Sequence, residues 1–445
     1  MRAPVLMISG VVLIGFALWL NNGHYNPLAL IAMLLTLVAT VVVVLRSSVV
    51  VGVPQRVLML AVLVQWLLML TRPPGIYLLP GTSLQPFQIG VIALAGLTIV
   101  QLSKSAQIAR VGFIGILTIY ALLGGWLIQA SPGPWIDVWS HQQAACDALL
   151  LGENPYRAQF NDIYGDNSPF YSPGMSENGK LTFGIAYPPM SLMLALPGYL
   201  VGGDVRYSLL GAMLLAAWVI SRFSSNVSDR ISTLAGLLYL SSPNQFFMLE
   251  QAWTESFLVL LLAMTLCVAN RRMKQVWQVL TLGLFIACKQ YVVLFLPLFW
   301  LIAPTKSRFA RLAVSALGVA ILCTLPLAVW DWSSFVQSTI MTHFNSPFRA
   351  DALTVNAWLF RTFDMQLPKW ISFVVLWPAI AWVVCKSARR PAGLAIGIAA
   401  VSLVFFIFSK QAFLNYYTFT VGALCCAIAL TASDSSSHRP STATV

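Results

Sequence analysis

The chain has 445 residues, of which 58% are hydrophobic and only 9% charged, and its mean hydropathy is +0.80. This composition excludes a soluble globular domain and predicts a membrane protein that crosses the bilayer many times. The formal net charge of +12 would suit a nucleic-acid-binding protein, but the basic residues lie in short turns between apolar runs, where they report membrane orientation. We therefore expect a multi-pass protein of the plasma membrane with no nucleic acid partner.

Apolar runs near the length of roughly 20 residues that crosses the hydrocarbon core recur along the whole chain. Because a backbone in lipid must satisfy its own hydrogen bonds, these runs predict an all-α membrane bundle of about 12–14 spans. The expected single spans, in chain order, are 4–20, 28–45, 57–70, 86–101, 111–130, 207–221, 231–247, 255–269, 312–330, 369–384, 392–409 and 415–431. The first run resembles a signal peptide but lacks a small-residue cleavage site, so we expect a retained helix.

Two apolar segments do not fit a simple span. Segment 276–303 is about 28 residues long and carries Lys289 at its middle, which predicts a hairpin of two short helices. Segment 187–203 would, as a full span, place Arg222 and Arg230 on the wrong side of the membrane. We therefore expect it to lie on the outer leaflet or dip into it.

Lysine and arginine are concentrated in alternate connections between the spans. By the positive-inside rule, this puts both termini in the cytoplasm and the long polar connection 131–206 outside, with interfacial helices in that connection. The acidic residues gather in the outer segments, so we expect the functional surface to be extracytoplasmic. Three regions follow: N-terminal transmembrane helices 1–110 of unassigned role, a transmembrane domain 111–431 that carries the outer connection, and a disordered cytoplasmic tail 432–445 rich in Ser and Thr.

Asp137 opens the outer connection directly after an apolar helix. The residues after it are compatible with a helix as far as the stop signal Asn154-Pro155, which predicts a short interfacial helix. Asp137, His141 and Asp147 share one flank of this helix at helical spacing. Two interpretations of Asp137 stay open: it caps the helix, or it is a catalytic carboxylate.

Three motifs, in this order, resemble those of a known family: Asp137-Val138-Trp139, Gly152-Glu153-Asn154-Pro155-Tyr156 and Tyr187-Pro188-Pro189. They look like the first large outer loop of the integral-membrane glycosyltransferases of the C-type fold, which use polyprenyl-phosphate sugars. The pattern is most similar to that of the bacterial polyprenol-phosphate-mannose-dependent α-mannosyltransferases. The likeness covers about 111–431, and the first four spans have no counterpart in it.

The resemblance implies an inverting transfer of a hexose, with mannose as the first candidate, from a polyprenyl-phosphate donor to a lipid-linked or cell-envelope glycan. In that family an acidic residue at the start of the outer loop is the general base, and Asp137 matches that position. A sugar hydroxyl is a weak nucleophile, and a carboxylate within hydrogen-bond reach takes its proton as it attacks. The resemblance implies no cofactor and no metal, and the acids Glu153, Asp162 and Asp166 match no metal-binding template.

The donor phosphate requires positive charge and hydrogen-bond donors, for which Lys289, His343 and Arg349 are the candidates. A lysine inside an apolar segment costs about 3 kcal/mol on insertion scales, so Lys289 should face a cavity or a partner. Its segment also resembles the lysine-containing segment near the donor phosphate in the family. A snorkelling lysine, or one paired with a buried acid, is an equally valid interpretation.

Possible contacts to the sugar or the acceptor are polar and aromatic residues of the outer segments: His141, Asp147, Asn154, Tyr156, Tyr187, Glu250, Gln251 and Lys410. Glu250 and Gln251 are more simply interpreted as ordinary residues of the membrane interface. Lys410 is a candidate for contacting either the phosphate or a sugar.

Two other functions are compatible with such a bundle. A flippase or transporter of a lipid-linked glycan intermediate should carry ionisable residues near the midplane of two corresponding halves, and only Lys289 meets that expectation. A lipid-linked glycan ligase or polymerase would share the bundle and the loop chemistry, but its donor would carry many sugars. The sequence defines neither the acceptor nor the oligomeric state.

Overall fold

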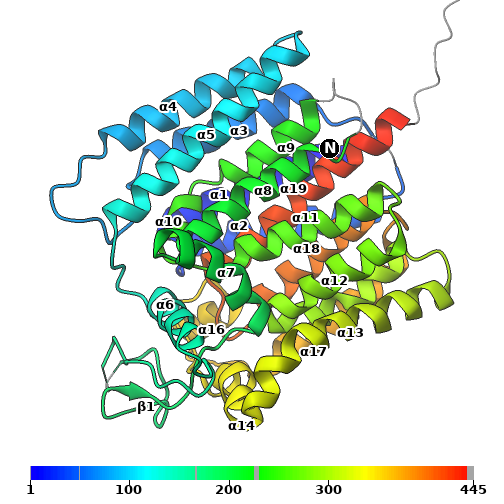
Figure 1. Ribbon diagram of the computed structural model, residues 1–445. Coiled ribbons are helices and arrows are strands. Elements are labelled where there is room, and N and C mark those ends of the chain that lie inside the picture. The colour runs from blue at the N-terminus through cyan, green and yellow to red at the C-terminus, as the bar shows by residue number, and fades with distance from the viewer. Residues whose placement is uncertain (1, 50, 166–167, 225–229, 438–445) are drawn as a thin grey trace, which may run out of the picture.

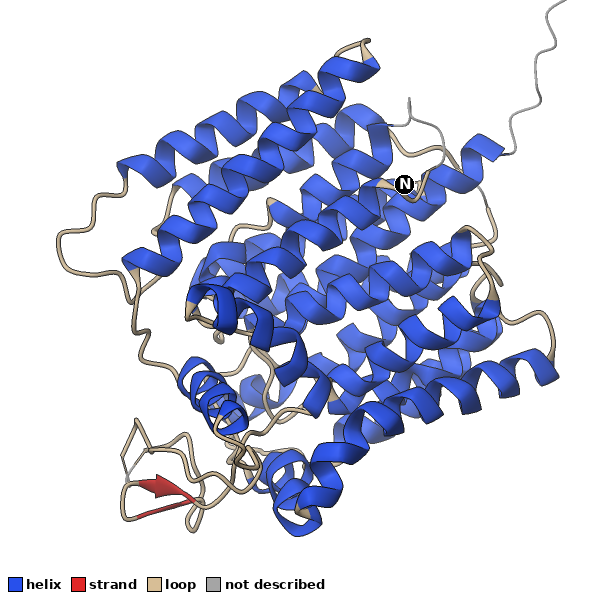
Figure 2. Ribbon diagram, in the orientation of Figure 1, coloured by secondary structure: helices blue, strands red, loops and turns tan. Residues whose placement is uncertain are grey.

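The computed structural model describes residues 2–49, 51–165, 168–224 and 230–437. The protein is 71% helical. Within the described residues the only strands are the short antiparallel pair β1 (Ser176–Glu177) and β2 (Lys180–Leu181), as Figure 2 shows. The prediction of an all-α fold is therefore confirmed.

Most of the long helices lie roughly parallel or antiparallel to one another and are joined at both ends of a bundle (Figure 1). In chain order they are α1 (Ala3–Asn21), α2 (Pro27–Leu45), α3 (Gln55–Leu70), α4 (Gln85–Val100), α5 (Ala106–Ala130), α7 (Pro189–Gly202), α8 (Arg206–Ser221), α9 (Arg230–Leu240), α11 (Glu255–Asn270), α12 (Gln275–Cys288), the 3₁₀ helix η1 (Gln290–Ile302), α13 (Lys306–Trp330), α17 (Ile371–Lys386), α18 (Pro391–Ile407) and α19 (Leu414–Ser437). The connections add the shorter helices α6 (Asp137–Leu150), α10 (Gln245–Glu250), α14 (Trp332–Val336), the π-helical η2 (Gln337–Met341), α15 (Thr342–Asn345) and α16 (Val355–Phe363).

Among the described residues, five helices are each long and apolar enough to cross a membrane, namely α1, α2, α5, α13 and α19. Other expected spans form apolar helices of 10–17 residues. The expected span 231–247, for example, is divided into α9 and α10 at Pro243, which has no amide hydrogen to continue the helix. Large apolar side chains such as Val38, Ile92 and Val314 are exposed on the outer faces, as contact with lipid requires. The protein is a multi-pass membrane protein.

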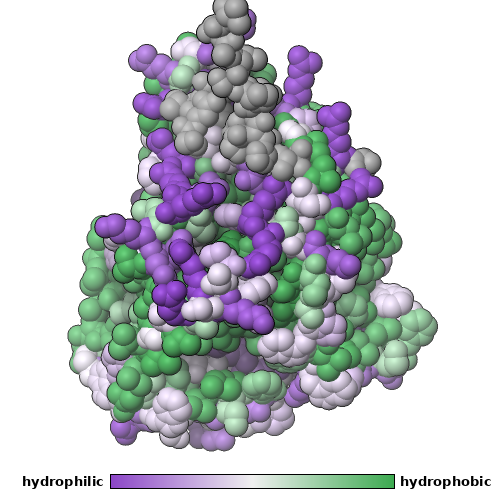
Figure 3. Space-filling model, turned by 90° about the vertical axis from the view of Figure 1, so that its right-hand side faces the viewer, coloured by the Kyte–Doolittle hydropathy of each residue, from purple (hydrophilic) through white to green (hydrophobic). Residues whose placement is uncertain are grey.

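The turns of the bundle are sorted to two ends. At one end the basic turns contact one another. The turn of Arg271 contacts the turn of Arg222, since Arg271 donates a hydrogen bond to the Arg222 carbonyl. Arg390 likewise donates to the Ser47 carbonyl. Hydrophilic side chains gather in the middle of this basic end, with hydrophobic surface beside them (Figure 3). The long polar connections lie at the other end of the bundle (Figure 1), so the predicted separation of basic turns from long polar connections is confirmed. Which of the two ends faces the cytoplasm stays a prediction.

Segment 276–303 follows its prediction, whereas the expected position of segment 187–203 at the outer leaflet stays a prediction. α12 and η1 meet at Lys289, where extended backbone (φ −152°, ψ 140°) breaks the helix. α12 begins beside the basic turn of Arg271, and η1 returns to the basic end, where Arg389 donates to the Ala303 carbonyl. This is the predicted hairpin. The axes of α7 and α8 are 113° apart, so 187–203 does not continue into a straight span.

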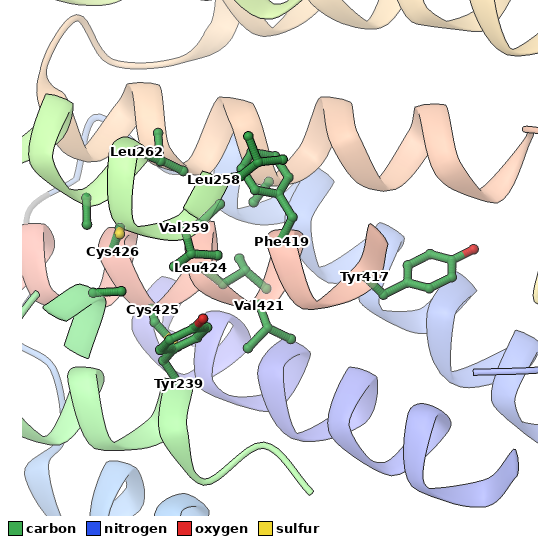
Figure 4. Close-up of a cluster of buried hydrophobic side chains, with 14 of the residues drawn as sticks. Tyr239, Leu258, Val259, Leu262, Tyr417, Phe419, Val421, Leu424, Cys425 and Cys426 are labelled. Carbon is green, nitrogen blue, oxygen red and sulfur yellow. The ribbon is translucent and has the colours of Figure 1, made fainter. Parts of the chain in front are cut away.

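α19 is the central helix of the bundle. Its side chains, among them Phe419 and Cys425, pack against α9 and α11 in a buried cluster (Figure 4). The helix continues to Ser437, so residues 432–437 of the expected disordered tail are helical instead, and 438–445 lie outside the described residues. The N-terminal helices belong to the same core, because α1 packs against α19 and α2 packs against α18.

Candidate active site

Two adjoining cavities lie at the loop end of the bundle. The larger one, which we call the polar cavity, has a volume of about 420 Å³, and Asp137 and many aromatic side chains line it. The smaller one, the apolar cavity, has a volume of about 310 Å³ and is bordered by η1, η2, α17 and α18. Lys289, His343, Gln411 and Tyr416 line both, so the two cavities meet at these residues.

Asp137 is the first residue of α6, and it lines the polar cavity. The Val138 amide donates to its Oδ1 atom at 2.7 Å, and the Tyr171 hydroxyl donates to Oδ2 at 3.2 Å. The Tyr164 hydroxyl lies 3.4 Å from Oδ1. The capping interpretation is wrong, because Ile136 occupies the N-cap position of α6 without a side-chain cap and Asp137 is the first helical residue. The catalytic interpretation stays a proposal, since the carboxylate borders a cavity in which it could accept a proton.

Tyr164 and Tyr171 hold the carboxylate of Asp137, and the sequence analysis missed them. Burial, followed by the charge of Asp137, raises the pKa of both hydroxyls, so they remain protonated and act as donors. Both residues lie in the irregular part of the outer connection, where neither helical spacing nor a motif marks them. Their only signal in the sequence is that two tyrosines occur in a polar loop.

His141 lies one helical turn after Asp137 and also lines the polar cavity. Its ring stacks on Phe160 with centroids 5.3 Å apart, and its Nε2 atom has no hydrogen-bond partner among the described residues. Burial lowers the pKa of His141 despite the opposing charge of Asp137, so a neutral imidazole is available to bind a hydroxyl group. Tyr187 and Gln251, two further predicted contacts, line the same cavity.

Lys289 forms a buried ion pair at the apex of the α12–η1 hairpin. Its Nζ atom donates to Glu255 Oε1 at 2.7 Å and to Thr254 Oγ1 at 3.0 Å, and it lies 4.6 Å from the centroid of the Tyr187 ring. Asn415 also donates to Glu255 Oε1, at 3.0 Å. The interpretation of a lysine paired with a buried acid is therefore correct, the snorkelling interpretation is wrong, and the paired lysine still lines both cavities.

His343 lies where the two cavities meet. Its Nε2 atom is 3.0 Å from the Ala186 carbonyl oxygen and 3.0 Å from the Gln290 amide nitrogen. Burial lowers the pKa of His343 to about 4, and the charges of Lys289 and Lys410 act in the same direction. His343 is therefore neutral near pH 7 and would offer a phosphate no positive charge.

Arg349 lines the polar cavity, but an acid already occupies its guanidinium group. It donates to both carboxylate oxygens of Asp351, at 2.8 and 2.7 Å, and its Cζ atom lies 4.6 Å from the Phe170 ring and 4.9 Å from the Phe413 ring. Burial alone would raise the pKa of Asp351, but hydrogen bonds from His24 and Arg349 outweigh it and lower that pKa. Arg349 is thus a member of an ion pair before any ligand binds.

Lys410 lines the apolar cavity close to His343. Its Nζ atom donates to the carbonyls of His343 at 2.6 Å and Ser346 at 2.7 Å. Burial, and to a smaller extent the charge of Lys369, lowers the pKa of Lys410 to about 8. Lys369 lines the same cavity and was not predicted. The apolar cavity therefore has two neighbouring lysines, neither of which forms an ion pair within the described residues.

The charge of Lys410 should make the binding of an anionic ligand to the apolar cavity depend on pH. A lysine loses its charge above its pKa, so we expect the affinity for dodecyl phosphate to fall as the pH rises through about 8. Lys410→Arg keeps its charge over this range and should bind with an affinity that no longer changes there. Titrations of each protein with dodecyl phosphate, followed by tryptophan fluorescence, measure both affinities. If the affinity of Lys410→Arg still fell near pH 8, a group other than Lys410 would cause the pH dependence.

Four predicted contacts line neither cavity. Asp147 is exposed and accepts a hydrogen bond from the Tyr199 hydroxyl. Asn154 accepts the Tyr156 amide at 2.9 Å, and the Tyr156 hydroxyl donates to the Tyr187 carbonyl at 2.9 Å, so this motif shapes the loop. Glu250 is fully buried and accepts backbone amides, as described below. Asp147 lies ten residues after Asp137 in α6, outside the lining of the polar cavity that Asp137 and His141 share.

Glu255 was not predicted as a site residue, although it is the acid that pairs with Lys289. It opens α11 directly after a polar turn, just as Asp137 opens α6, and an acidic residue before a long apolar run is a usable signal. Its partner Lys289 is 34 positions away, and no local pattern connects the two.

No protein-family model matches the chain, and no curated protein matches it either. Two solved structures of ArnT from Cupriavidus metallidurans are similar to it, one bound to undecaprenyl phosphate (14% identity) and one in the apo state (17% identity). Both have a TM-score of 0.45, and they cover 72% and 73% of this chain and 60% of the ArnT chain. By its own fold and site, the protein is a polytopic α-helical membrane protein with a polar cavity and an apolar cavity at one end of the bundle.

Proposed function

We propose that the protein is a membrane glycosyltransferase. It transfers a hexose, with mannose as the first candidate, from a polyprenyl-phosphate donor to a hydroxyl group of a lipid-linked or cell-envelope glycan at the extracytoplasmic face. The observation that carries this proposal is the junction of the two cavities, because a carboxylate borders one of them, lysines border the other, and Lys289 and His343 border both.

The apolar cavity suits the lipid part of the donor. Leu294, Ile340, Phe373 and Phe405 contribute its apolar lining, and such side chains would exclude water from a prenyl chain. The phosphate would then lie at the polar rim, within reach of Lys410 and Lys369 for charge-assisted hydrogen bonds. The hexose would extend from the phosphate into the polar cavity.

The chemistry is a single displacement with inversion. The acceptor hydroxyl gives its proton to the Asp137 carboxylate as its oxygen forms a bond to the anomeric carbon. The bond between the anomeric carbon and the phosphate oxygen breaks at the same time, and the phosphate leaves with the electron pair. Because phosphate is a stable leaving group, the proposed reaction needs no general acid, and we propose no metal or cofactor.

The proposal is tested most directly by finding which class of donor the protein uses. We would supply the purified protein in lipid nanodiscs with polyprenyl-phosphate mannose, polyprenyl-phosphate glucose or a polyprenyl-diphosphate oligosaccharide, together with octyl α-mannoside as acceptor. We expect transfer from a monophosphate donor and a product of inverted configuration. Use of the oligosaccharide donor alone would favour the ligase, whereas movement of labelled lipid across proteoliposomes without any transfer would favour the flippase.

A further inference from the structure

Two turns of the four N-terminal helices reach the polar cavity. His24 comes from the turn between α1 and α2, and Ile76 and Tyr77 come from the connection between α3 and α4. Neither turn contributes to the apolar cavity. The N-terminal helices therefore supply part of the wall of the proposed active site, on the side away from the lipid part of the donor.

A buried carboxylate fixes the α3–α4 connection at Tyr77. Glu250 accepts the Ile76 amide at 2.7 Å and the Tyr77 amide at 2.9 Å, and its side chain is fully buried. A Cβ atom at Gly75 would overlap this carboxylate, so the close approach requires glycine. Leu79 adds a backbone bond of 2.8 Å to the Ala130 carbonyl. The ring of Tyr77 is thus attached to a rigid backbone beside the start of the outer connection.

Tyr77 lines the same polar cavity as Asp137. Burial raises the pKa of Tyr77, and the charges of Glu250 and then Asp137 raise it further, so the hydroxyl is a donor within electrostatic reach of the proposed base. Trp135, Tyr164 and Tyr77 all line this cavity with Asp137. An amphipathic ring with a hydroxyl suits a sugar, which has an apolar face and a rim of hydroxyl groups.

We propose that the α3–α4 connection forms the acceptor subsite, where Tyr77 stacks against an uncharged sugar ring of the acceptor glycan. The inference rests on the proposed function, because an inverting displacement brings the nucleophile from the side opposite the leaving phosphate. Tyr77 borders the polar cavity only, whereas the residues shared with the apolar cavity lie on the phosphate side. The described lining of the polar cavity contains one lysine, Lys289, and one arginine, Arg349, and each of them is in an ion pair. Because these charges are already neutralised, the cavity favours an uncharged sugar ring over an anionic one.

The test separates acceptor binding from donor use. With the full chain in nanodiscs and labelled polyprenyl-phosphate mannose, we would measure transfer to octyl α-mannoside and, without acceptor, transfer to water. Tyr77→Ala should raise the KM for octyl α-mannoside about tenfold, because the stacked ring is lost. The donor KM and the rate of transfer to water should stay within about twofold of wild type. Tyr77→Phe, which keeps the ring, should change the acceptor KM by less than about threefold.

Leu79→Ala is the matched control, because its half-exposed side chain belongs to the same connection and lies outside the cavity lining. An unchanged acceptor KM in Tyr77→Ala, or equal changes of its donor and acceptor KM, would contradict the proposed acceptor subsite and leave the proposed function intact. A preference of the wild type for a mannoside 6-phosphate over the neutral mannoside would contradict the proposal that the acceptor ring is uncharged. Failure of the wild type to use any monophosphate donor would overturn both proposals.

Discussion

Replacing Asp137 with asparagine should lower the rate of hexose transfer by about 10²–10⁴-fold, the range that a positioned general base contributes. Asparagine has nearly the same shape, and its carbonyl oxygen can still accept the Val138 amide and one tyrosine hydroxyl, so the start of α6 should remain folded. It cannot take a proton from the acceptor hydroxyl. Steady-state transfer from polyprenyl-phosphate mannose measures the effect, with the donor KM expected to change little.

Two further variants test whether the loss of rate in Asp137→Asn comes from the loss of a general base. Glu153→Gln removes an exposed acid of the same outer connection and should leave the rate unchanged. If Asp137 only supports the start of α6 through its hydrogen bonds, Asp137→Ala should lower the thermal unfolding temperature while Asp137→Asn transfers hexose at the wild-type rate. That second pattern would falsify the general-base role.

Breaking the buried pair between Lys289 and Glu255 should have the largest effect on stability. Lys289→Met leaves the Glu255 carboxylate buried with Asn415 as its remaining donor, and loss of one partner of a buried pair costs about 3–5 kcal/mol. Glu255→Gln should destabilise the protein in the same way, because Lys289 then keeps only neutral partners such as Thr254. Thermal unfolding in detergent, together with the yield of folded protein, measures both variants.

The double variant Lys289→Met, Glu255→Gln separates structure from function. It removes both charges, so most of the lost stability should return. The donor KM should nevertheless remain raised by about tenfold or more, because the cation at the junction of the two cavities is absent. Wild-type kinetics in a stable double variant would mean that Lys289 serves only the packing of the α12–η1 hairpin.

Local features of the sequence predicted much of the bundle correctly. Apolar length predicted the helices because a backbone in lipid has no other way to satisfy its hydrogen bonds. The break at Lys289 followed from one charge in the middle of an apolar segment, and the start of α6 at Asp137 followed from the polar residue after an apolar run. The expected disorder of 432–437 failed because α19 is held by the core and its last turns extend the helix beyond the apolar stretch.

The partners of the charged residues could not be predicted in this way. Glu250 looked like an ordinary interface residue, yet its carboxylate accepts the amides of Ile76 and Tyr77, more than 170 positions away. Arg349 was a phosphate candidate, and only the fold shows that Asp351 and two aromatic rings already surround it. Such pairings depend on which helices pack together, and no periodicity in the chain records that choice.

The sequence by itself therefore determined the membrane class, the positions of most helices and the sorting of basic turns to one end, because hydropathy and charge act on each segment separately. The tertiary structure alone decided that Asp137 is held by Tyr164 and Tyr171, that Lys289 pairs with Glu255, and that the N-terminal turns border the polar cavity. These contacts join segments that are distant in the chain, and only the packing of the helices brings them within hydrogen-bond distance.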